Sequence, residues 1–367
     1  MNNKILEKII DSCVECELCT DNCSLLNEKG ETPLAMAKRG ITVKDAYSCS
    51  LCGLCEAVCP QEVSPMAMFA DRRREAVTKR EIDIDEYRYM FPDRKNNVMS
   101  LYRQEFGIDY SDIDHFEDAG TCFFPGCTLM TFSPVLTREI FQRLKSSCNC
   151  DGMWTECCGK PLEQLGLQQR LETMHCHLKQ FVETHHIKRI ITACPGCYYE
   201  LREIFKADDL VVQTVYEVLQ FGIRALDETR RYTVHDSCPD RTEGVFGRQV
   251  RQVLGQHNGT ILEMTHNREK TICCGSGGQQ SHFRPDLVEK VVQMRHAEVR
   301  QAGADTLVGY CMSCILKYES EMPEVSVVHA LSLMLDVELD YKGAKERSRN
   351  MLSGPGGEKL WKEIMAE

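Results

Sequence analysis

A five-cysteine pattern that occurs twice constrains the fold of this 367-residue chain more than any other feature. Each copy has a single cysteine, then an adjacent cysteine pair followed by glycine, then a Cys-x-x-Cys pair. The first copy contains Cys127, Cys157, Cys158, Cys194 and Cys197, and the second contains Cys238, Cys273, Cys274, Cys311 and Cys314. Counterparts lie 111 to 117 residues apart, and such regular spacing indicates a duplicated domain.

Short apolar runs recur at matching places in both copies and predict buried strands. They cover residues 121–124, 187–192 and 210–213 in the first copy and 232–235, 306–309 and 325–328 in the second. Amphipathic patterns over 168–184 and 287–299 predict helices between them. Strands that alternate with helices favour α/β units with parallel pairing, so the cysteines are expected at the carboxyl ends of strands.

Eight further cysteines form two tight runs near the N-terminus. The first run is Cys13, Cys16, Cys19 and Cys23, and the second is Cys49, Cys52, Cys55 and Cys59 before a proline. This spacing is typical of ferredoxins with two [4Fe–4S] clusters, in which the fourth cysteine of each run binds the other cluster. We therefore predict one cluster on Cys13, Cys16, Cys19 and Cys59, and a second on Cys49, Cys52, Cys55 and Cys23.

Zinc sites and disulfides are the alternative explanations for 22 cysteines. Structural zinc sites usually divide their ligands into separated pairs, which fits two tight runs of four poorly. Disulfides need an oxidising compartment, whereas the N-terminal sequence lacks the apolar core of an export signal. Both alternatives stay open, and iron–sulfur ligands are the favoured interpretation.

The charge balance and the hydropathy pattern limit the partners. The chain has 44 basic and 55 acidic residues, a net charge of −11, whereas binding a nucleic acid needs a cationic surface. No apolar run approaches the roughly 18 to 20 residues that span a bilayer. We expect no nucleic-acid partner, no direct membrane span, and a cytoplasmic protein that associates with a membrane only through a partner subunit.

The repeated cysteines carry a family resemblance. Adjacent cysteines suit a cofactor in which each thiolate meets a different iron, and the glycine after them lets the backbone approach it. Both copies resemble the CCG domain, and the Phe124-Pro-Gly-Cys127 and His235-Asp-Ser-Cys238 segments are similar to that family as well. With a two-cluster ferredoxin domain before them, the chain resembles the catalytic subunit of heterodisulfide reductase. It is also similar to the iron–sulfur subunits of anaerobic glycerol-3-phosphate dehydrogenase and of lactate and glycolate oxidases.

The resemblance implies a noncubane [4Fe–4S] cluster on the five cysteines of each copy, where a disulfide is reduced or formed by single-electron steps. The ten cysteines of the two copies are therefore the candidate catalytic residues. The alternative is a pure electron relay, the iron–sulfur subunit of a flavin-dependent dehydrogenase that passes electrons to quinone. The implied partners are a flavin-containing subunit, a ferredoxin or a membrane cytochrome, and a small-molecule or protein disulfide. The chain itself shows no flavin or nicotinamide motif.

We predict a multidomain chain of α+β and α/β type: a helical two-cluster ferredoxin domain followed by a duplicated α/β CCG domain with pseudo-twofold symmetry. Its parts are residues 1–80 (ferredoxin domain), 81–118 (connector with some helix), 119–228 (first repeat), 229–340 (second repeat) and 341–367 (tail). Residues 354–357 are expected to break the tail before a short helix that begins at Glu358.

The remaining candidates have plain interpretations. Buried packing is expected for Cys122, Cys148, Cys150 and Cys176, which have no counterpart in the repeat. The Arg72–Arg74 run is expected on a solvated helix face, and residues 275–278 form a tight turn beside the second cysteine site. His235 and His282 are either structural or proton donors to a product thiol.

Overall fold

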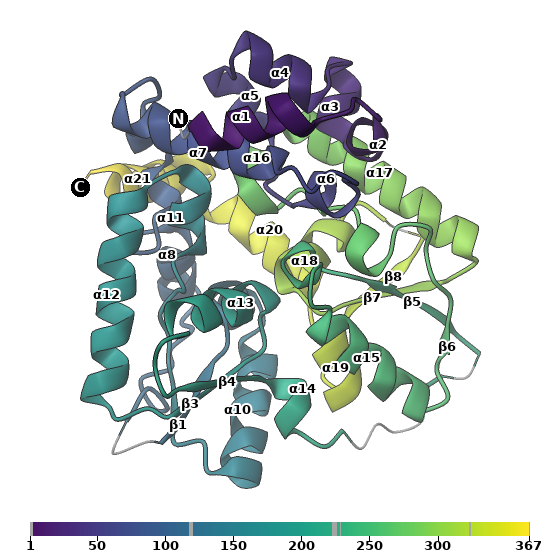
Figure 1. The fold of residues 1–367 in the computed structure, drawn as a ribbon. Helices are drawn as coiled ribbons and strands as arrows, with labels where there is room; N and C mark the ends of the chain where they lie inside the picture. The colour runs from purple at the N-terminus through teal and green to yellow at the C-terminus, as the bar shows by residue number, and fades with distance from the viewer. Residues whose placement is uncertain (1–2, 117–119, 222–225, 228, 323, 367) are drawn as a thin grey trace.

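The computed structural model describes residues 3–116, 120–221, 226–227, 229–322 and 324–366. A layer of N-terminal helices lies at the top of Figure 1, and two separate parallel sheets flanked by helices lie below it. The two sheets with their helices fit the predicted α/β class.

Short helices build the N-terminal layer. They are α1 (Asn3–Ser12), α2 (Leu18–Asn22), α3 (Ser24–Lys29), α4 (Pro33–Arg39), α5 (Val43–Ser48), α6 (Leu54–Ala57) and α7 (Pro65–Thr78). Thr32 and Thr42 begin α4 and α5, because their side chains accept hydrogen bonds from backbone N–H groups of the first turn. Proline in the first turn of α4 and α7 fits a helix start, since its missing N–H has no partner there anyway.

The segment after α7 contains η1 (Ile84–Met90) and α8 (Val98–Glu105), which confirms the predicted helical content of the connector. Asn97 begins α8 by accepting hydrogen bonds from the N–H groups of Met99 and Ser100. Helix α8 lies beside α9 (Cys127–Phe132), the first helix of the first repeat.

The first sheet has four parallel strands in the order β2-β1-β3-β4. The strands are β1 (Thr121–Phe124), β2 (Gly152–Met153), β3 (Arg189–Thr192) and β4 (Val211–Thr214). The helices are α9 (Cys127–Phe132), α10 (Pro134–Cys148), α11 (Lys160–Leu165), α12 (Gln168–Thr184), α13 (Pro195–Ile204) and α14 (Val215–Val218). The chain crosses from β2 to the other side of β1 to form β3, so the carboxyl ends of these three strands meet at a switch point where α/β proteins bind ligands.

The second sheet is parallel as well, in the corresponding order β6-β5-β7-β8. Its strands are β5 (Arg231–His235), β6 (Thr260–Ile261), β7 (Thr306–Gly309) and β8 (Ser326–His329). Its helices are η2 (Cys238–Asp240), α15 (Val245–Gln256), η3 (Arg268–Lys270), η4 (Gly277–Gln279), α16 (Gln280–Phe283), α17 (Pro285–Ala302), α18 (Met312–Glu319) and α19 (Ala330–Leu335). The three predicted strands of each copy are confirmed, whereas β2 and β6 have two residues each and were not predicted.

The tail forms two helices, α20 (Tyr341–Met351) and α21 (Gly354–Met365). The expected break at residues 354–357 is wrong, because these residues form the first turn of α21. Pro355 is compatible with that place, since a first-turn residue needs no N–H partner.

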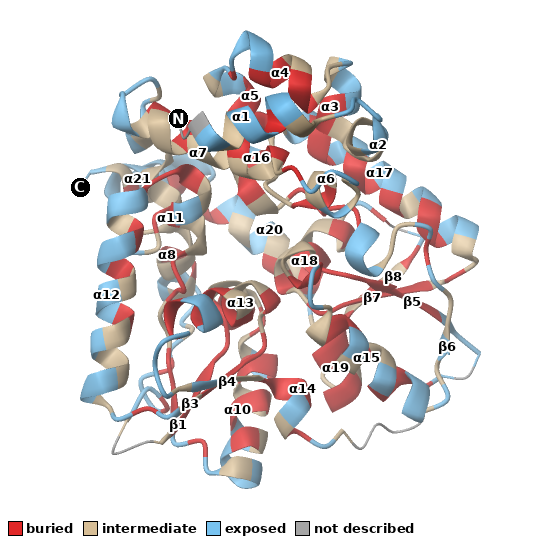
Figure 2. Cartoon of the chain, viewed as in Figure 1, coloured by how far each residue is buried: buried red, intermediate tan, exposed pale blue. Residues whose placement is uncertain are grey.

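One apolar core joins the two sheets. Phe123 and Ile191 of the first sheet belong to the same buried cluster as Val234 and Leu307 of the second. Figure 2 shows the inner strands β1, β3, β5 and β7 as mostly buried, whereas the edge strands β4 and β6 are partly exposed. Phe246 of α15 lies with its ring centroid 5.5 Å from that of Tyr198 on α13, so side chains of the two copies interlock.

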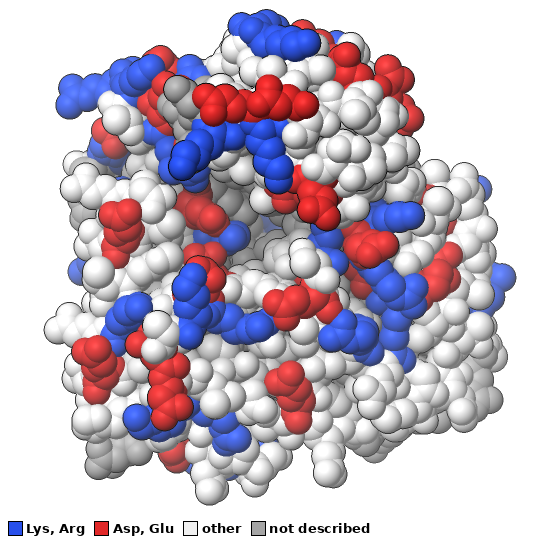
Figure 3. Space-filling view, viewed as in Figure 1, with Lys and Arg blue, Asp and Glu red and all other residues white. Residues whose placement is uncertain are grey.

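The surface carries charges of both signs. Figure 3 shows acidic and basic side chains intermixed on one face, which is hollowed between the N-terminal layer and the rest of the chain. None of the helices among the described residues combines the length and the apolar character that crossing a bilayer requires.

Candidate metal centres

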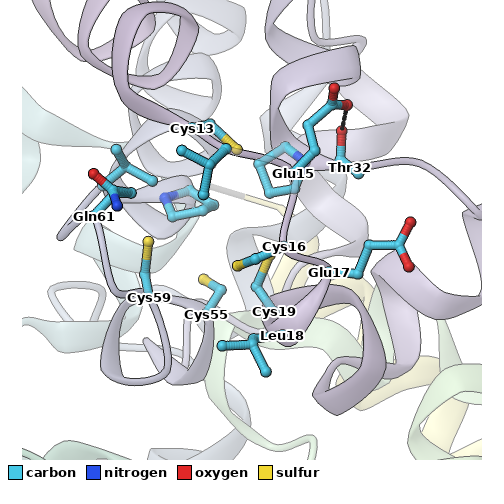
Figure 4. A pocket seen from close by; sticks show the side chains of 14 residues that line it. Cys13, Glu15, Cys16, Glu17, Leu18, Cys19, Thr32, Cys55, Cys59 and Gln61 are labelled. Carbon is cyan, nitrogen blue, oxygen red and sulfur yellow. Dashed lines mark hydrogen bonds between the residues drawn. The ribbon is translucent and has the colours of Figure 1, made fainter.

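The first N-terminal cysteines gather around one hollow. Cys13, Cys16, Cys19, Cys55 and Cys59 line it together with apolar residues. Figure 4 shows their sulfur atoms directed into the same space, whereas Glu15 and Glu17 point away from it. Burial raises the pKa of Cys19 to about 11, so this thiol needs a cationic partner to lose its proton.

The second group lies deeper. Cys23, Cys49, Cys52 and Cys55 line a second hollow, which also reaches Cys273 of the second repeat. Burial raises the pKa of Cys23 to about 11 and that of Cys49 further. Cys59 of the second run lines the first hollow, and Cys23 of the first run lines the second.

The five cysteines of the first repeat meet at the carboxyl ends of β1, β2 and β3. Cys127 begins α9, Cys157 and Cys158 precede α11, and Cys194 precedes α13. The sulfur atoms of Cys127 and Cys157 are 3.9 Å apart. Contacts between thiols continue from Cys157 to Cys158, Cys197 and Cys194, so the five sulfurs form a chain.

The second repeat shows the same order of contacts. The sulfur atoms of Cys238 and Cys273 are 4.0 Å apart, and those of Cys274 and Cys314 are 3.1 Å apart. Contacts between Cys273 and Cys274 and between Cys314 and Cys311 complete the chain. The structure therefore brings together all five predicted cysteines in each copy.

The second cysteine of each adjacent pair has a lowered pKa. Hydrogen bonds from the thiols of Cys157 and Cys197 hold the pKa of Cys158 well below its ordinary value. Those of Cys273 and Cys314 do the same for the pKa of Cys274. Metals bind thiolates, so both positions are suited to a metal ligand.

Glycines allow the backbone to approach these thiols. Gly126 has φ +88°, and a Cβ atom there would lie 2.7 Å from Cβ of Cys194. Gly275 has φ +81°, and its N–H donates to the sulfur of Cys273 over 3.3 Å. A residue with a side chain would be strained at either position.

The two repeat sites face each other. The hydroxyl oxygens of Thr128, beside Cys127, and Ser313, between Cys311 and Cys314, are 3.2 Å apart. Ser276 donates to the carbonyl oxygen of Ser313 over 3.4 Å. The first contact brings the cysteine loops of the two copies into one region, and the second joins two loops of the second copy.

The second N-terminal group adjoins the second repeat. The thiols of Cys52 and Cys273 lie within hydrogen-bond distance of each other. Arg241 spans the junction, because its Nε donates to the carbonyl oxygen of Cys52 over 3.0 Å and its Nη2 to that of Thr271 over 2.7 Å. The turn at Gly278 packs on the same loop, where a Cβ atom would lie 2.8 Å from the carbonyl oxygen of Cys49. The predicted tight turn is confirmed, and it abuts the N-terminal layer.

The expected solvated face for Arg72–Arg74 is wrong for the first two arginines, which are buried. The guanidinium group of Arg73 donates to carbonyl oxygens of Ala46, Cys49, Gln164 and Gly278. These acceptors belong to the N-terminal layer and to both repeats, and they lie far apart in sequence. Only the folded chain brings them together, so no local pattern in the sequence predicts this role.

The two candidate histidines differ in their surroundings. His235 is buried, and burial holds its pKa well below the ordinary value. The structure shows no hydrogen-bond partner for either of its ring nitrogens among the described residues. His282 instead lines a cavity, where its Nδ1 lies 2.8 Å from the hydroxyl of Tyr89.

The four remaining cysteines do not behave alike. Cys122 and Cys150 are fully buried, which confirms the expected packing. Cys148 is half-buried, and its thiol donates to the carbonyl oxygen of Leu144. Cys176 is exposed on α12, so the expected packing is wrong there. All 22 cysteines are free in this structure.

The donor sets fit iron–sulfur clusters. Among the described residues, no three His, Cys, Asp or Glu side chains converge enough to hold a single metal ion. Each N-terminal hollow is lined by at least four thiols, and each repeat supplies a chain of five. Sulfur donors distributed in this way suit a cofactor with several irons.

Two family models match the chain. One, described as a 4Fe-4S dicluster domain, matches residues 9–63. The other, described as a cysteine-rich domain, matches residues 121–202 and again residues 232–317. The two matches of the second model coincide with the two five-cysteine sets.

Curated relatives include components of redox enzymes. One component of dihydromethanophenazine:CoB–CoM heterodisulfide reductase from Methanosarcina acetivorans is 24% identical over 90% of this chain and 95% of its own. One component of fumarate reductase (CoM/CoB) from Methanothermobacter marburgensis is 23% identical over 89% of this chain and 72% of its own. Lactate utilization protein A 1 from Bacillus mycoides is 24% identical over 54% of this chain and 88% of its own.

Solved structures give only a weak likeness. Glutamate racemase RacE1 from Bacillus anthracis aligns with 65% of this chain and 82% of its own, at 12% identity and a TM-score of 0.31. A score this low supports no statement about fold or function.

Proposed function

The chain belongs to the CCG-domain iron–sulfur proteins, with a 4Fe-4S dicluster domain before two cysteine-rich domains, and on that premise we propose that it reduces or forms disulfides as part of a redox complex. The clusters, when bound, supply single electrons: two cubane [4Fe–4S] clusters on the N-terminal cysteines and a noncubane cluster on each repeat. The net reaction adds two electrons and two protons to a disulfide and breaks its S–S bond to give two thiols. The electrons come from a reduced partner protein.

The observation that carries this proposal is the pair of facing five-thiol chains. Thr128 and Ser313 bring their loops within hydrogen-bond distance, so one small molecule can reach both. A site that only relayed electrons would need no second set of five thiols. The likeness to a component of a heterodisulfide reductase over 90% of the chain supports the same interpretation.

The positions of the thiol groups support an electron route. Cys55 lines both N-terminal hollows, and Cys52 adjoins Cys273 of the second repeat. The groups therefore form a series from the first N-terminal hollow to the second, then to the second repeat, and from there to the first. In our proposal, electrons enter at the hollow that contains Cys16, the exposed member of its group.

We also propose the division of the chain that the sequence predicts: 1–80, 81–118, 119–228, 229–340 and 341–367. The shared strand order of the two sheets supports a pseudo-twofold relation between the repeats. A flavin-containing subunit, a ferredoxin or a membrane cytochrome would donate electrons from the side of the N-terminal layer, and the protein would reside in the cytoplasm or reach a membrane through that partner.

A pure electron relay is the second candidate. The likeness to lactate utilization protein A 1, which aligns with 54% of the chain, supports this candidate. In that case the protein would pass electrons from a flavin dehydrogenase toward quinone, and no disulfide would react.

Anaerobic reoxidation of the reduced protein tests the proposal. The iron-loaded protein is reduced with a viologen, candidate disulfides are added, and EPR spectra follow the oxidation state. Reoxidation coupled to thiol release supports disulfide chemistry, and reoxidation only by quinone or a flavin partner contradicts it.

Matched cysteine variants locate the reaction. Cys158→Ser and Cys274→Ser are expected to abolish reoxidation by disulfides and to leave the EPR signals of the N-terminal clusters intact. Cys176→Ser is the control, because this exposed residue lies outside every thiol group. Full activity in both Cys158→Ser and Cys274→Ser would rule out the assigned site.

A further inference from the structure

A large cavity opens beside the first repeat. It has a volume of about 920 Å³, within the range of small-molecule sites. Four parts of the chain form its walls: the connector, the first repeat, the loop that follows the Cys-Cys-Gly of the second repeat, and helix α20. Cys127 and Cys157 are the thiols that line it, so the cavity leads to the first five-thiol chain.

The cavity has an excess of positive charge. Arg94, Lys95, Arg103 and Arg170 line it, against the carboxylates of Asp93 and Glu156. Both carboxylates are already paired, Asp93 with Arg170 over 2.8 Å and Glu156 with His177 over 2.9 Å. Because the chain as a whole has a net charge of −11, its composition does not account for this cationic cavity.

Arg103 lies close to the thiols of the cavity. It projects from α8, donates to the hydroxyl of Thr131 over 2.7 Å, and is close enough to Cys127 and Cys157 to interact with their charge. Among the residues that the structure describes, no carboxylate lies within ion-pair distance of Arg103 or Lys95. A partly buried guanidinium group without a carboxylate partner is a typical anion-binding group.

Part of the wall is apolar and adaptable. Met130 and Phe132 of α9 and Met174 of α12 line the cavity. Methionine side chains adapt to ligands of irregular shape. The wall therefore suits a flexible carbon chain with an anionic group at one end.

The geometry points to a binding site for a small thiol or disulfide that bears a carboxylate, with the anionic group at Arg103 and Lys95 and the sulfur toward Cys127 and Cys157. The inference rests on the proposed function only for the orientation of the sulfur. The binding of the anion depends on the side chains of the cavity alone.

Binding measurements distinguish the anion site from the proposed disulfide chemistry. Anaerobic calorimetry on the full-length, iron-loaded protein compares 3,3′-dithiodipropionate, a dianion, with uncharged bis(2-hydroxyethyl) disulfide and with cystamine, a dication. The dianion is expected to bind about tenfold or more tightly than either, with an affinity that falls as salt is added, because charge-assisted hydrogen bonds are screened and specific to anions.

Single substitutions test which side chains bind the anion. Arg103→Gln and Lys95→Gln are each expected to weaken binding of the dianion about tenfold, which is the loss of about one charge-assisted hydrogen bond. Arg138→Gln is the matched control, because Arg138 lies on α10 outside the cavity and pairs with Asp112. Lys95 is exposed, so its variant tests the site even where Arg103→Gln impairs folding.

Each outcome decides one question. Equal affinity for the three disulfides overturns the anion site. So does a loss of affinity in Arg138→Gln that equals the loss in Arg103→Gln and Lys95→Gln. A shifted cluster potential in Arg103→Gln with unchanged affinity also overturns it, since Arg103 then only balances the charge of the thiolates. Selective binding without reoxidation of the reduced protein keeps the anion site and overturns the proposed disulfide chemistry.

Discussion

Arg73 connects three parts of the chain through one guanidinium group. Its acceptors are backbone carbonyl oxygens of the N-terminal layer, of α11 in the first repeat, and of the turn at Gly278 in the second. The ring of Tyr47 also lies 4.8 Å below the guanidinium carbon. Burial lowers the pKa of Arg73 to about 10, so the group keeps its charge at neutral pH.

Replacing Arg73 should therefore destabilise the protein. Arg73→Met is expected to lower the free energy of unfolding by about 3 kcal/mol, since buried carbonyl groups that lose a donor carry a penalty of about 1–3 kcal/mol each. Anaerobic denaturation with urea measures the change. Arg74→Met is the control, and its effect is expected within about 0.5 kcal/mol because Arg74 is partly exposed. Equal effects of the two variants would contradict the role of Arg73.

Iron removal should change which cysteines react. In the iron-loaded protein, alkylation is expected to modify the exposed Cys176 first and Cys148 more slowly. After chelation of the iron, the eighteen predicted ligands should react as well, because thiolates held by metal are protected and free ones are not. Peptide mass spectrometry measures the order. A predicted ligand that reacts as fast as Cys176 before chelation is not a ligand.

At the scale of elements, the parallel strands decide where the chemistry lies. Cys127, Cys194, Cys238 and Cys311 each follow a strand by two or three residues, and so the carboxyl edge of each sheet collects the thiols. Helix starts then fix the direction of the loops. The start of α19 shows this, because Nδ1 of His329 accepts a hydrogen bond from the N–H of Leu331 over 3.2 Å.

His329 should make the stability depend on pH. Burial lowers the pKa of His329 to about 3, and only the neutral ring can accept the hydrogen bond of the helix start. The unfolded chain binds a proton near its ordinary pKa of about 6.5, so stability falls as the pH drops below that value toward 3. His329→Asn keeps an acceptor at the helix start and removes the titration.

The test compares the free energy of unfolding of the wild type and His329→Asn at two pH values. Between about pH 7 and pH 5.5, the wild type is expected to lose about 1 kcal/mol more than the variant. The same pH dependence of the free energy of unfolding in both proteins would show that His329 is not held neutral.

The elements that the sequence predicted are those with a local signal. The runs at 121–124 and 306–309 have the predicted bounds as β1 and β7, and α12 has the predicted bounds as well. The strands β2 and β6 escape prediction, because two residues carry no periodicity. The cysteine groups follow from spacing, whereas Arg73, Arg103 and Arg241 acquire their roles from acceptors and thiols far away in sequence.

At the scale of the whole molecule, the two repeats share one apolar core. Phe246 is fully buried, and its ring packs between Tyr198 and Tyr216 of the first repeat and Tyr310 of the second. The largest apolar cluster contains strands of both sheets. We therefore expect the repeats to unfold together and not as separate domains.

Phe246→Ala tests this expectation. Deleting a buried aromatic ring should lower the free energy of unfolding by about 3–5 kcal/mol, and both repeats should lose hydrogen-exchange protection to the same extent. Val135→Ala is the control, since Val135 is exposed and its truncation should change stability by less than about 0.5 kcal/mol. Loss of protection in the second repeat alone would show that the halves are independent.

The contact between Cys52 and Cys273 also bears on how the protein is made. Once the N-terminal layer has docked, the turn at Gly278 and the side chain of Gln280 lie against its second cysteine loop, and the thiols of Cys52 and Cys273 are within hydrogen-bond distance. Docking therefore covers the side of the second repeat at which Cys273 lies, and we expect iron and sulfide to enter before it. If the proposed ligands are correct, maturation has a fixed sequence in which the second repeat is loaded first and the N-terminal layer closes over it. The ribosome synthesises the N-terminal helices first. These helices are therefore expected to stay undocked until the last cysteine loop has been translated and has bound its iron and sulfide.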